Sequence, residues 1–239
     1  MMVANEVIVE TVKGWVKTNR PFALLRFGDG EGLFAKLHGS SSKMVQASVK
    51  HWGHVPGRVS RIKIEHSIKK AYDQCDVAGL PFGFDSSGWR GSLQQFLMRP
   101  VHGQQIKCSA NIHIDMDQSG FIAELVKGRR VLFVGCRDIR AKMAEMGALS
   151  TEIISTSEQY KFAAVKPLLP FYLQVEDIEM RIRCMDLKGT VCLLAAGVAG
   201  KYIGIVMRDR GGMVIDIGSV ADKWAGVKSR SWIKVGETV

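Results

Sequence analysis

Two acidic residues, Asp29 and Glu31, stand two positions apart in the glycine-rich segment RFGDGEG, which spans residues 26–32. The glycines allow the backbone to bend so that both carboxylates converge on one point. Two hard oxygen ligands suit Mg²⁺ or Mn²⁺ bridging a diphosphate. Arg26 is close enough in the chain to bind a phosphate with its guanidinium group. The segment therefore suggests a metal–diphosphate site.

The same spacing has a simpler interpretation. An acidic turn often joins a strand to a helix, with Asp29 as the N-cap and Glu31 in the first helical turn. Because the Asp-x-Glu pattern is common in proteins, spacing alone favours this interpretation. Other parts of the chain must decide between the two.

A second glycine-rich segment, AGVAGK at residues 196–201, follows an apolar run and opens a helical pattern. Backbone N–H groups at such a helix start can bind a phosphate, with Lys201 adding positive charge. The segment lacks the spacing of a Walker A loop and is not G-x-G-x-x-G. Alternatively, Gly197 and Gly200 allow a helix and a strand to pack closely.

The segment IDIGSVAD at residues 215–222 places Asp216 within an expected strand and Asp222 just beyond it. Either carboxylate could be a metal ligand, a base or a partner for a sugar hydroxyl. The structural alternatives are a buried Asp216 that accepts backbone N–H bonds and an Asp222 that caps a helix. Both interpretations remain open for both residues.

Composition narrows the class of protein. The chain has 239 residues, of which 46% are hydrophobic, so it can bury a full core and is not disordered. Its five cysteines include no C-x-x-C pair, which argues against a disulfide framework or a zinc ribbon. The first residues do not resemble a signal peptide, and no apolar run is long enough to span a bilayer. We expect a reduced, cytoplasmic, soluble protein, and the inner membrane surface is compatible with this location.

Positive charge is concentrated in one part of the chain. The net charge is +10, which suggests an anionic partner. Residues 36–70 contain eight Lys and Arg residues and one acidic residue, Glu65. This basic segment could contact a phospholipid surface or a nucleic acid, or it could be a solvated helix face. No known nucleic-acid-binding motif accompanies it, which argues against nucleic acid.

The apolar pattern predicts alternating helices and strands. Expected helices are 3–16 with Asn5 as a cap, 33–38, 117–128, 138–148, 169–186 and 199–211, and expected strands are 22–27, 131–135, 151–156, 190–196 and 213–218. This order predicts an α/β, Rossmann-like fold with a mostly parallel sheet and helices on both faces. We expect one domain over residues 1–239, with a possible internal seam near residue 118. Ligands of such sheets bind beyond the carboxyl ends of the strands.

Two segments together resemble a known family. RFGDGE after an N-terminal strand resembles the Asp-x-Glu signature of the GT-D-fold glycosyltransferases, which are bacterial sugar transferases often linked to polysaccharide biosynthesis. GVAGKYIGIVMRDRGGMVIDIGSVADKWAG is similar to the end of that family's domain. The similar stretches are residues 26–34 and 195–226. The order of the two segments makes the resemblance more specific than either segment alone.

The resemblance implies a nucleotide-diphosphate sugar donor, commonly UDP-linked, a divalent metal, typically Mn²⁺, and a glycan or lipid-linked acceptor. It places Asp29 and Glu31 on the metal and Asp222 near the far wall of the donor pocket. Where some relatives have a histidine after IDIG, this chain has Ser219, so no histidine ligand is available there. The donor-binding residues that the resemblance implies are Arg26, Gly28, Gly30, Gly197, Gly200, Lys201, Asp216 and Ser219.

An inverting transferase also needs a carboxylate base near the acceptor hydroxyl, for which Asp222 and Asp85 are candidates. Segment 81–97, with Trp89 and Arg90, is expected to help form the sugar or acceptor pocket. Two other functions remain open. One is a basic Rossmann-like module that binds a nucleotide or nucleic acid without catalysis, and the other is a different Rossmann enzyme such as a methyltransferase. The basic segment could also make a peripheral contact with a membrane.

Overall fold

A computed structural model describes residues 2–34, 42–81, 105–159, 163 and 169–233. Within the helices, the side chains of residues 29, 33, 34, 42–44 and 47 are not described. Every structural statement below concerns the described part of the chain.

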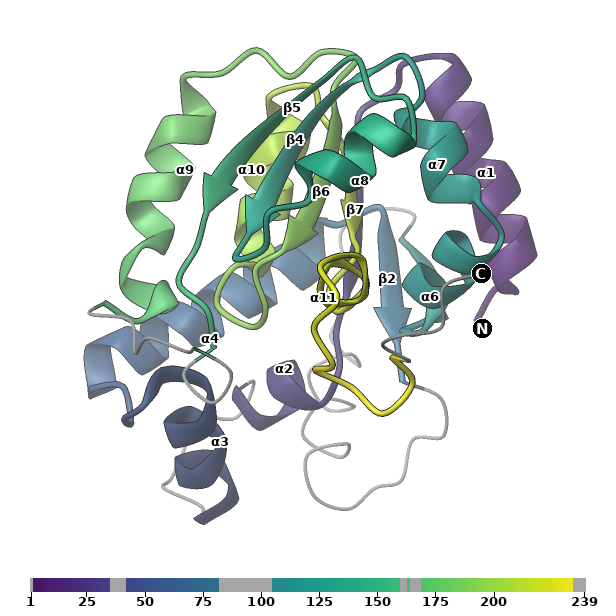
Figure 1. Ribbon diagram of the computed structural model, residues 1–239. Helices are drawn as coiled ribbons and strands as arrows, with labels where there is room; N and C mark the ends of the chain where they lie inside the picture. Colours follow the sequence, from purple (N-terminus) through teal and green to yellow (C-terminus); the bar gives the residue numbers. More distant parts are fainter. Residues whose placement is uncertain (1, 35–41, 82–104, 160–162, 164–168, 234–239) are drawn as a thin grey trace.

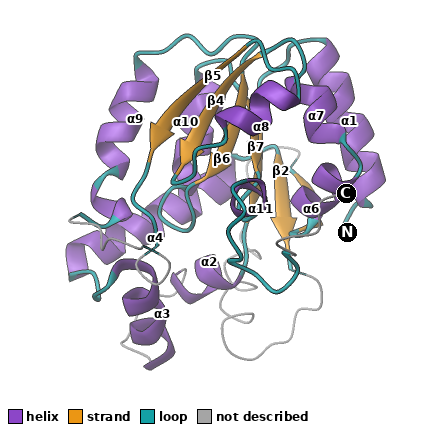
Figure 2. Cartoon of the chain, in the orientation of Figure 1, coloured by secondary structure: helices purple, strands orange, loops and turns teal. Residues whose placement is uncertain are grey.

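Seven strands of this part form a single sheet in the order β3-β2-β1-β7-β6-β4-β5, and every neighbouring pair is parallel (Figure 2). The strands are β1 (Phe22–Arg26), β2 (Val77–Leu80), β3 (Ile106–Ser109), β4 (Arg130–Gly135), β5 (Ser150–Ser155), β6 (Val191–Ala195) and β7 (Met213–Asp216). Strand β1, from the start of the chain, pairs with β7, from near its end. The predicted α/β fold with a parallel sheet is confirmed.

Helices cover both faces of the sheet (Figure 1). One face packs against α4 (Arg58–Gln74), α9 (Val175–Arg183) and α10 (Lys201–Asp209), and the other packs against α1 (Asn5–Lys17), α6 (Ile112–Gln118), α7 (Phe121–Val126), α8 (Arg140–Glu145) and α11 (Val220–Trp224). Alternate residues of β1 point to opposite faces of the sheet. Ala23 and Leu25 pack in the hydrophobic core on the α4, α9 and α10 side, and Phe22 and Leu24 pack in the core on the other side. The near-continuous apolar strand sequences reflect this burial on both faces.

Two predicted helices are each divided in the structure. The range 169–186 contains a 3₁₀ turn, η1 (Phe171–Leu173), and then α9, with Gln174 between them. The Gln174 side chain accepts a hydrogen bond from the Ser157 backbone N–H at 3.1 Å, and its amide donates to the Ser157 hydroxyl at 2.6 Å. The range 117–128 is divided between α6 and α7 by Gly120, whose φ of 74° does not fit a right-handed helix.

The predicted cap of α1 is also different. Asn5 is the first residue of the helix, and the extended residue Ala4 precedes it. The Asn5 side chain donates a hydrogen bond to Asp115 on α6 at 2.5 Å. This bond ties α1 to α6, whereas an N-cap would have bonded within its own helix.

Candidate functional site

Arg26 and Asp216 end the two adjacent strands β1 and β7. The Arg26 backbone N–H donates to Oδ2 of Asp216 at 3.3 Å, and Nη1 of Arg26 lies 3.9 Å from Oδ1 of Asp216. Carboxyl ends of neighbouring parallel strands meet at one edge of a sheet, which is where ligands of such folds bind. Two residues predicted from the N- and C-terminal motifs are therefore brought together.

Lys201 joins the same group from α10, which follows β6. Its ammonium group forms an ion pair with Asp216 and lies 3.2 Å from Oε1 of Glu31, and all three side chains are less than 10% exposed. Burial disfavours the charge on Lys201, but the neighbouring Asp216 and Glu31 outweigh it and raise the Lys201 pKa. Burial alone would raise the pKa of Asp216, but Lys201 and Arg26 hold it below its usual value. Lys201 and Asp216 are therefore both charged at neutral pH.

Glu31 lies in α2 (Asp29–Phe34), which begins directly after β1. Its Oε2 accepts a hydrogen bond from the Gly28 backbone N–H at 2.8 Å, so the side chain reaches back to the helix start as in a capping box. The helix-start interpretation agrees with the position of Glu31 in the first turn, but Asp29 is the first residue of α2 and not its N-cap. The side chain of Asp29 lies outside the described part, so the convergence of two carboxylates on a cation stays a prediction.

The described residues do not by themselves fit a divalent cation. No three His, Cys, Asp or Glu side chains gather among them in a metal-binding arrangement. Moreover, the carboxylates of Glu31 and Asp216 already share the ammonium group of Lys201, which stands where a cation would be needed.

The Arg26 guanidinium is fixed on a second side. Its Nε donates to the carbonyl oxygen of Ala110, just after β3, at 2.6 Å. Gly218, with a φ of 45°, provides space for it, because a Cβ at this position would collide with Nη1 of Arg26. The side chain remains 20% exposed. Arg26 is thus held in place and still accessible to a ligand.

Two of the other predicted glycines, Gly30 and Gly200, allow close packing around the loop before α10. A Cβ on Gly30 would lie 2.6 Å from Cγ2 of Val198, and a Cβ on Gly200 would lie 3.0 Å from both the Ala196 carbonyl oxygen and the Phe171 ring. Gly197 is exposed, with a φ of 60°. Gly200 precedes α10 and supplies no side-chain cap, so this helix start resembles a phosphate-binding one.

Asp222 belongs to a separate group. It lies in α11, and its Oδ1 accepts a hydrogen bond from Nε of Arg137 at 2.7 Å, while Oδ2 accepts one from the Ser229 hydroxyl at 2.5 Å. Arg137 follows β4 and also pairs with Glu158 at 2.5 Å. Ser219 is half-buried at the start of α11. The role of Asp222 as a base stays a prediction.

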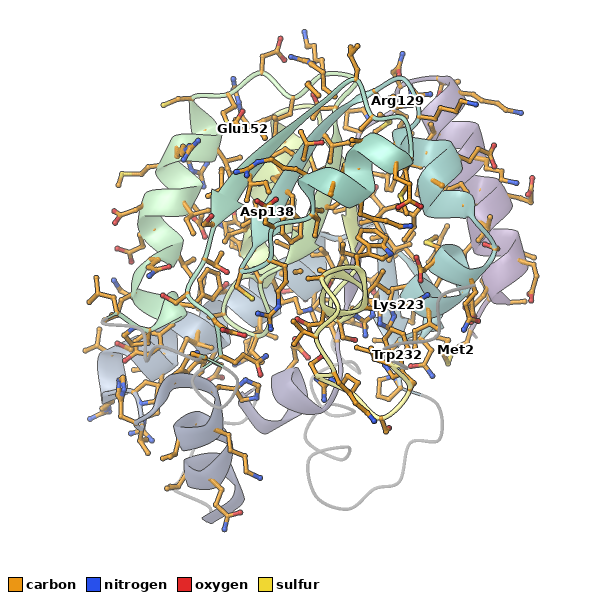
Figure 3. The ribbon with its side chains drawn as sticks, in the orientation of Figure 1. Met2, Arg129, Asp138, Glu152, Lys223 and Trp232 are labelled. Carbon is orange, nitrogen blue, oxygen red and sulfur yellow. The ribbon has the colours of Figure 1, made fainter. Side chains whose placement is uncertain are left out.

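Sequence reasoning missed His113, which lies on α6 and is 2% exposed. Burial, with a smaller contribution from the charge of Arg26, lowers its pKa to about 2, so the ring is neutral. Neither ring nitrogen forms a hydrogen bond of standard geometry with the residues described. The Trp232 ring, labelled in Figure 3, lies 6.3 Å away in an edge-on arrangement. A lone histidine in a short helix gives no sequence signal for this position.

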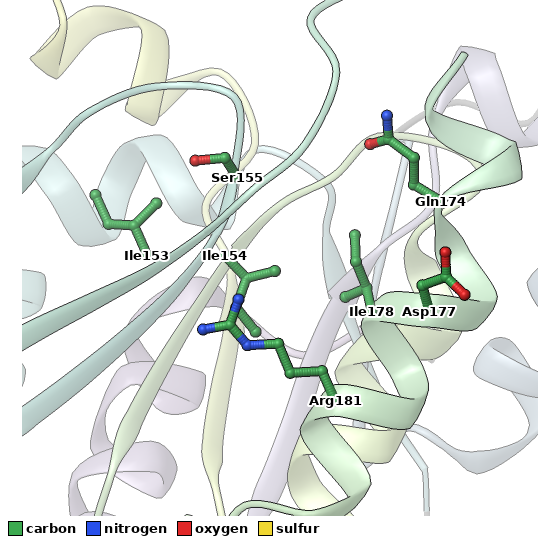
Figure 4. Close-up of a pocket in the computed structure, with 7 residues that line it drawn as sticks. All are labelled: Ile153, Ile154, Ser155, Gln174, Asp177, Ile178 and Arg181. Carbon is green, nitrogen blue, oxygen red and sulfur yellow. The ribbon is translucent and has the colours of Figure 1, made fainter. Parts of the chain in front are cut away.

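The remaining expectations concern other parts of the molecule. Asp85, Trp89 and Arg90 lie outside the described residues. A pocket of about 490 Å³ lies between β5 and α9, and no predicted site residue lines it (Figure 4). Among the helices that the structure describes, none has the length and apolar character needed to cross a membrane.

Comparison with known proteins agrees with this fold. A model of the GT-D fold-like domain matches residues 3–224. Two solved structures, both of domain of unknown function 1792, align with a TM-score of 0.60 and 15% identity over 99% of this chain and 87% of theirs. One is described as having a distinct glycosyltransferase fold. No curated protein matches the chain. The family match covers almost the whole chain, and the protein belongs to the GT-D-like family.

Proposed function

We propose that this protein transfers a sugar from a nucleotide-diphosphate donor, with UDP-linked sugars as the first candidates, to a glycan or a lipid-linked acceptor. Membership of the GT-D-like family supports a glycosyltransferase. The observation that carries the proposal is the convergence of Arg26, Lys201, Asp216 and Glu31 at the carboxyl ends of the strands. A cytoplasmic location, where we expect the donor to be available, is part of the same proposal.

Arg26 is suited to the leaving group. As the bond between sugar and diphosphate breaks, negative charge develops on the phosphate oxygens, and fixed N–H donors stabilise it. The hydrogen bond to Ala110 and the ion pair with Asp216 hold the Arg26 guanidinium in position, so little reorganisation is needed when charge develops. Its partial exposure leaves the group within reach of a phosphate.

Lys201 and α10 contribute in different ways. The start of α10 presents the positive end of a helix dipole and amide groups without a side-chain cap. Lys201 itself is buried, and its charge balances Glu31 and Asp216. Without this balance the two carboxylates would repel a diphosphate at the same edge. We therefore assign Lys201 a positioning and charge-balancing role.

The acceptor side is assigned to Asp222 as a proposal. Its carboxylate is held by Arg137 and Ser229 and is 19% exposed, so it is oriented without being sealed from solvent. A carboxylate in this setting can remove the proton from an attacking hydroxyl. None of these residue roles requires a metal. Assays with Mn²⁺, Mg²⁺ or EDTA test whether the metal predicted from the sequence is needed.

Donor binding and turnover test the proposal. We would measure thermal stabilisation and hydrolysis with UDP-, GDP- and CDP-sugars, each with Mn²⁺, Mg²⁺ or EDTA. We expect at least one donor to raise Tm and to be hydrolysed, because a ligand that binds only the folded state stabilises it. Arg26→Gln should lower turnover by about 100-fold, whereas Arg140→Gln, which removes an exposed guanidinium paired with Asp138, should not.

Other outcomes would reject the proposal. Stabilisation by S-adenosylmethionine alone would indicate a methyltransferase, and binding of an oligonucleotide without donor turnover would indicate a nucleic-acid-binding module. Activity that EDTA abolishes and Mn²⁺ restores would support the metal prediction. Activity unchanged by EDTA would favour the charge-balanced arrangement around Lys201.

A further inference from the structure

Exposed apolar side chains are concentrated in one short stretch of the chain. Four of the nine large hydrophobic residues that are exposed in the described part lie between residues 49 and 62. They are Val49 (43% exposed), Val55 (37%), Val59 (69%) and Ile62 (55%). They lie on α3 (Ser42–Trp52), on α4 and on the connection between these helices. We call these four residues, together with Lys50 and Arg58, the α3–α4 surface.

These apolar residues are not part of the buried core. Helix α4 buries Ile64, Ile68, Ala71 and Tyr72 against the sheet layer. Val59 and Ile62 are three residues apart, which places them together on a different face of the helix. The solvent-exposed face of a helix normally carries polar residues. The exposed face at the start of α4 carries Val59 and Ile62 instead, which is the composition of a contact surface.

Positive charge accompanies the apolar residues. Lys50 and Arg58 are exposed next to them in the chain, and the sequence of segment 36–70 has eight basic residues against one acidic residue. Two of these basic residues are paired, Lys63 with Glu176 of α9 and Lys69 with Glu65. Aliphatic side chains beside cations suit an anionic bilayer, because the former enter the headgroup–acyl boundary while the latter pair with lipid phosphates. A nucleic-acid backbone would bind the cations but would make no favourable contact with three valines and an isoleucine.

The α3–α4 surface lies at the same edge of the sheet as the candidate site. Helix α2, which carries Glu31, contacts both α3 and α4. Figure 1 shows α2 and α3 beyond the carboxyl ends of the strands, below the arrowheads of β2 and β5. A bilayer on this surface would bring its headgroups to the side of the molecule where the donor is proposed to bind.

We propose that the α3–α4 surface docks the protein on an anionic lipid bilayer. The docking itself does not depend on catalysis. Its consequence, that the protein reaches a lipid-linked acceptor, rests on the proposed function. Each basic residue near an anionic surface strengthens binding by about fivefold, and burying aliphatic side chains adds to this.

Vesicle co-sedimentation of the full chain tests the proposal. We expect binding to vesicles of phosphatidylcholine mixed with phosphatidylglycerol, weaker binding to phosphatidylcholine alone, and a loss of binding with added salt. Val59→Ser with Ile62→Ser should weaken binding by about tenfold or more. The matched control is Val7→Ser with Leu149→Ser, which removes two equally exposed apolar side chains elsewhere and should leave binding unchanged. Circular dichroism and thermal unfolding would show that both double variants fold.

Two results would overturn the proposal. One is the absence of binding to anionic vesicles at low salt. The other is unchanged binding of the Val59→Ser/Ile62→Ser variant together with competition by an oligonucleotide, which would identify a nucleic-acid surface. Donor hydrolysis measured without vesicles separates the two proposals: loss of vesicle binding with normal hydrolysis rejects only the docking, and the reverse rejects only the transferase.

Discussion

The ammonium group of Lys201 lies 3.2 Å from the carboxylate of Glu31, and both side chains are less than 10% exposed. This contact joins the first helix after β1 to the helix after β6, and Asp216 at the end of β7 completes the group. The Lys201 ammonium group thus forms ion pairs with two buried carboxylates from different parts of the chain. Removing it leaves both without their main counter-charge.

Lys201→Met is therefore expected to destabilise the protein by about 3–5 kcal/mol, since it leaves buried carboxylates unpaired. Urea unfolding would measure the change in the free energy of unfolding. Lys142→Met is the matched control, because Lys142 pairs with Glu145 at the surface and its loss should cost no more than about 1 kcal/mol. Similar effects of the two substitutions would contradict the importance given to the buried pair.

Acid should destabilise the fold through His113. Its pKa is about 2 in the folded protein, and an unperturbed histidine has a value of 6.5. Between these values the unfolded chain binds a proton that the folded chain does not, so stability falls as pH decreases below 6.5. The contribution is about 1.4 kcal/mol for each pH unit.

The pH slope of urea unfolding would measure this effect in wild type and in His113→Gln, which should have a shallower slope. His66→Gln, at an exposed position on α4, is the control and should keep the wild-type slope. Equal slopes in all three proteins would show that His113 is protonated in the fold.

Gly218→Ala should impair the site more than it impairs the fold. Both Gly218 and Gly226 have positive φ, so an alanine at either position should cost about 1 kcal/mol of stability. Only at Gly218 would the new Cβ collide with Arg26, whereas the space at Gly226 is open. We expect Gly218→Ala to lower kcat/KM for the donor by about tenfold or more, because it displaces a positioned group. Equal activity in the two variants would show that the position of Arg26 does not matter.

If the Asp222 carboxylate is the base, Asp222→Asn should lower the rate of transfer to an acceptor by about 100-fold or more. The informative comparison is Glu158→Gln, which removes the other carboxylate that binds Arg137. If Glu158→Gln has an equally large effect, Asp222 acts by positioning Arg137. Transfer rates of the wild type and of both variants would check the assignment.

The fold was predictable where apolar runs were long. VLFVG, TVCLLAA and MVIDIG lie in β4, β6 and β7 because strands buried on both faces need continuous apolar sequence. Strands β2 and β3 were missed, since VAGL and IKCS have four residues each and carry little periodic signal. Helix ends were less accurate, as Gln174 and Gly120 show, because side-chain contacts and glycine conformation decide them.

The candidate site was predictable as a set of residues and not as a set of contacts. The motifs identified Arg26, Lys201 and Asp216, because each follows or ends an apolar run. Their pairing depends on β1 lying beside β7, and no local pattern specifies that neighbour. The Asp-x-Glu spacing also did not reveal that Glu31 would bond with Gly28 and Lys201, since both contacts depend on where α2 begins.

The pairing of β1 with β7 has a consequence for synthesis of the protein. A ribosome completes β1, with Arg26, long before it adds Lys201 and Asp216. Until then the nascent chain holds the unpaired edge of β1 and an Arg26 that lacks its later counter-ion. The candidate site is thus completed late in translation, and a chain interrupted before residue 201 would retain the first acidic motif without its ammonium partner.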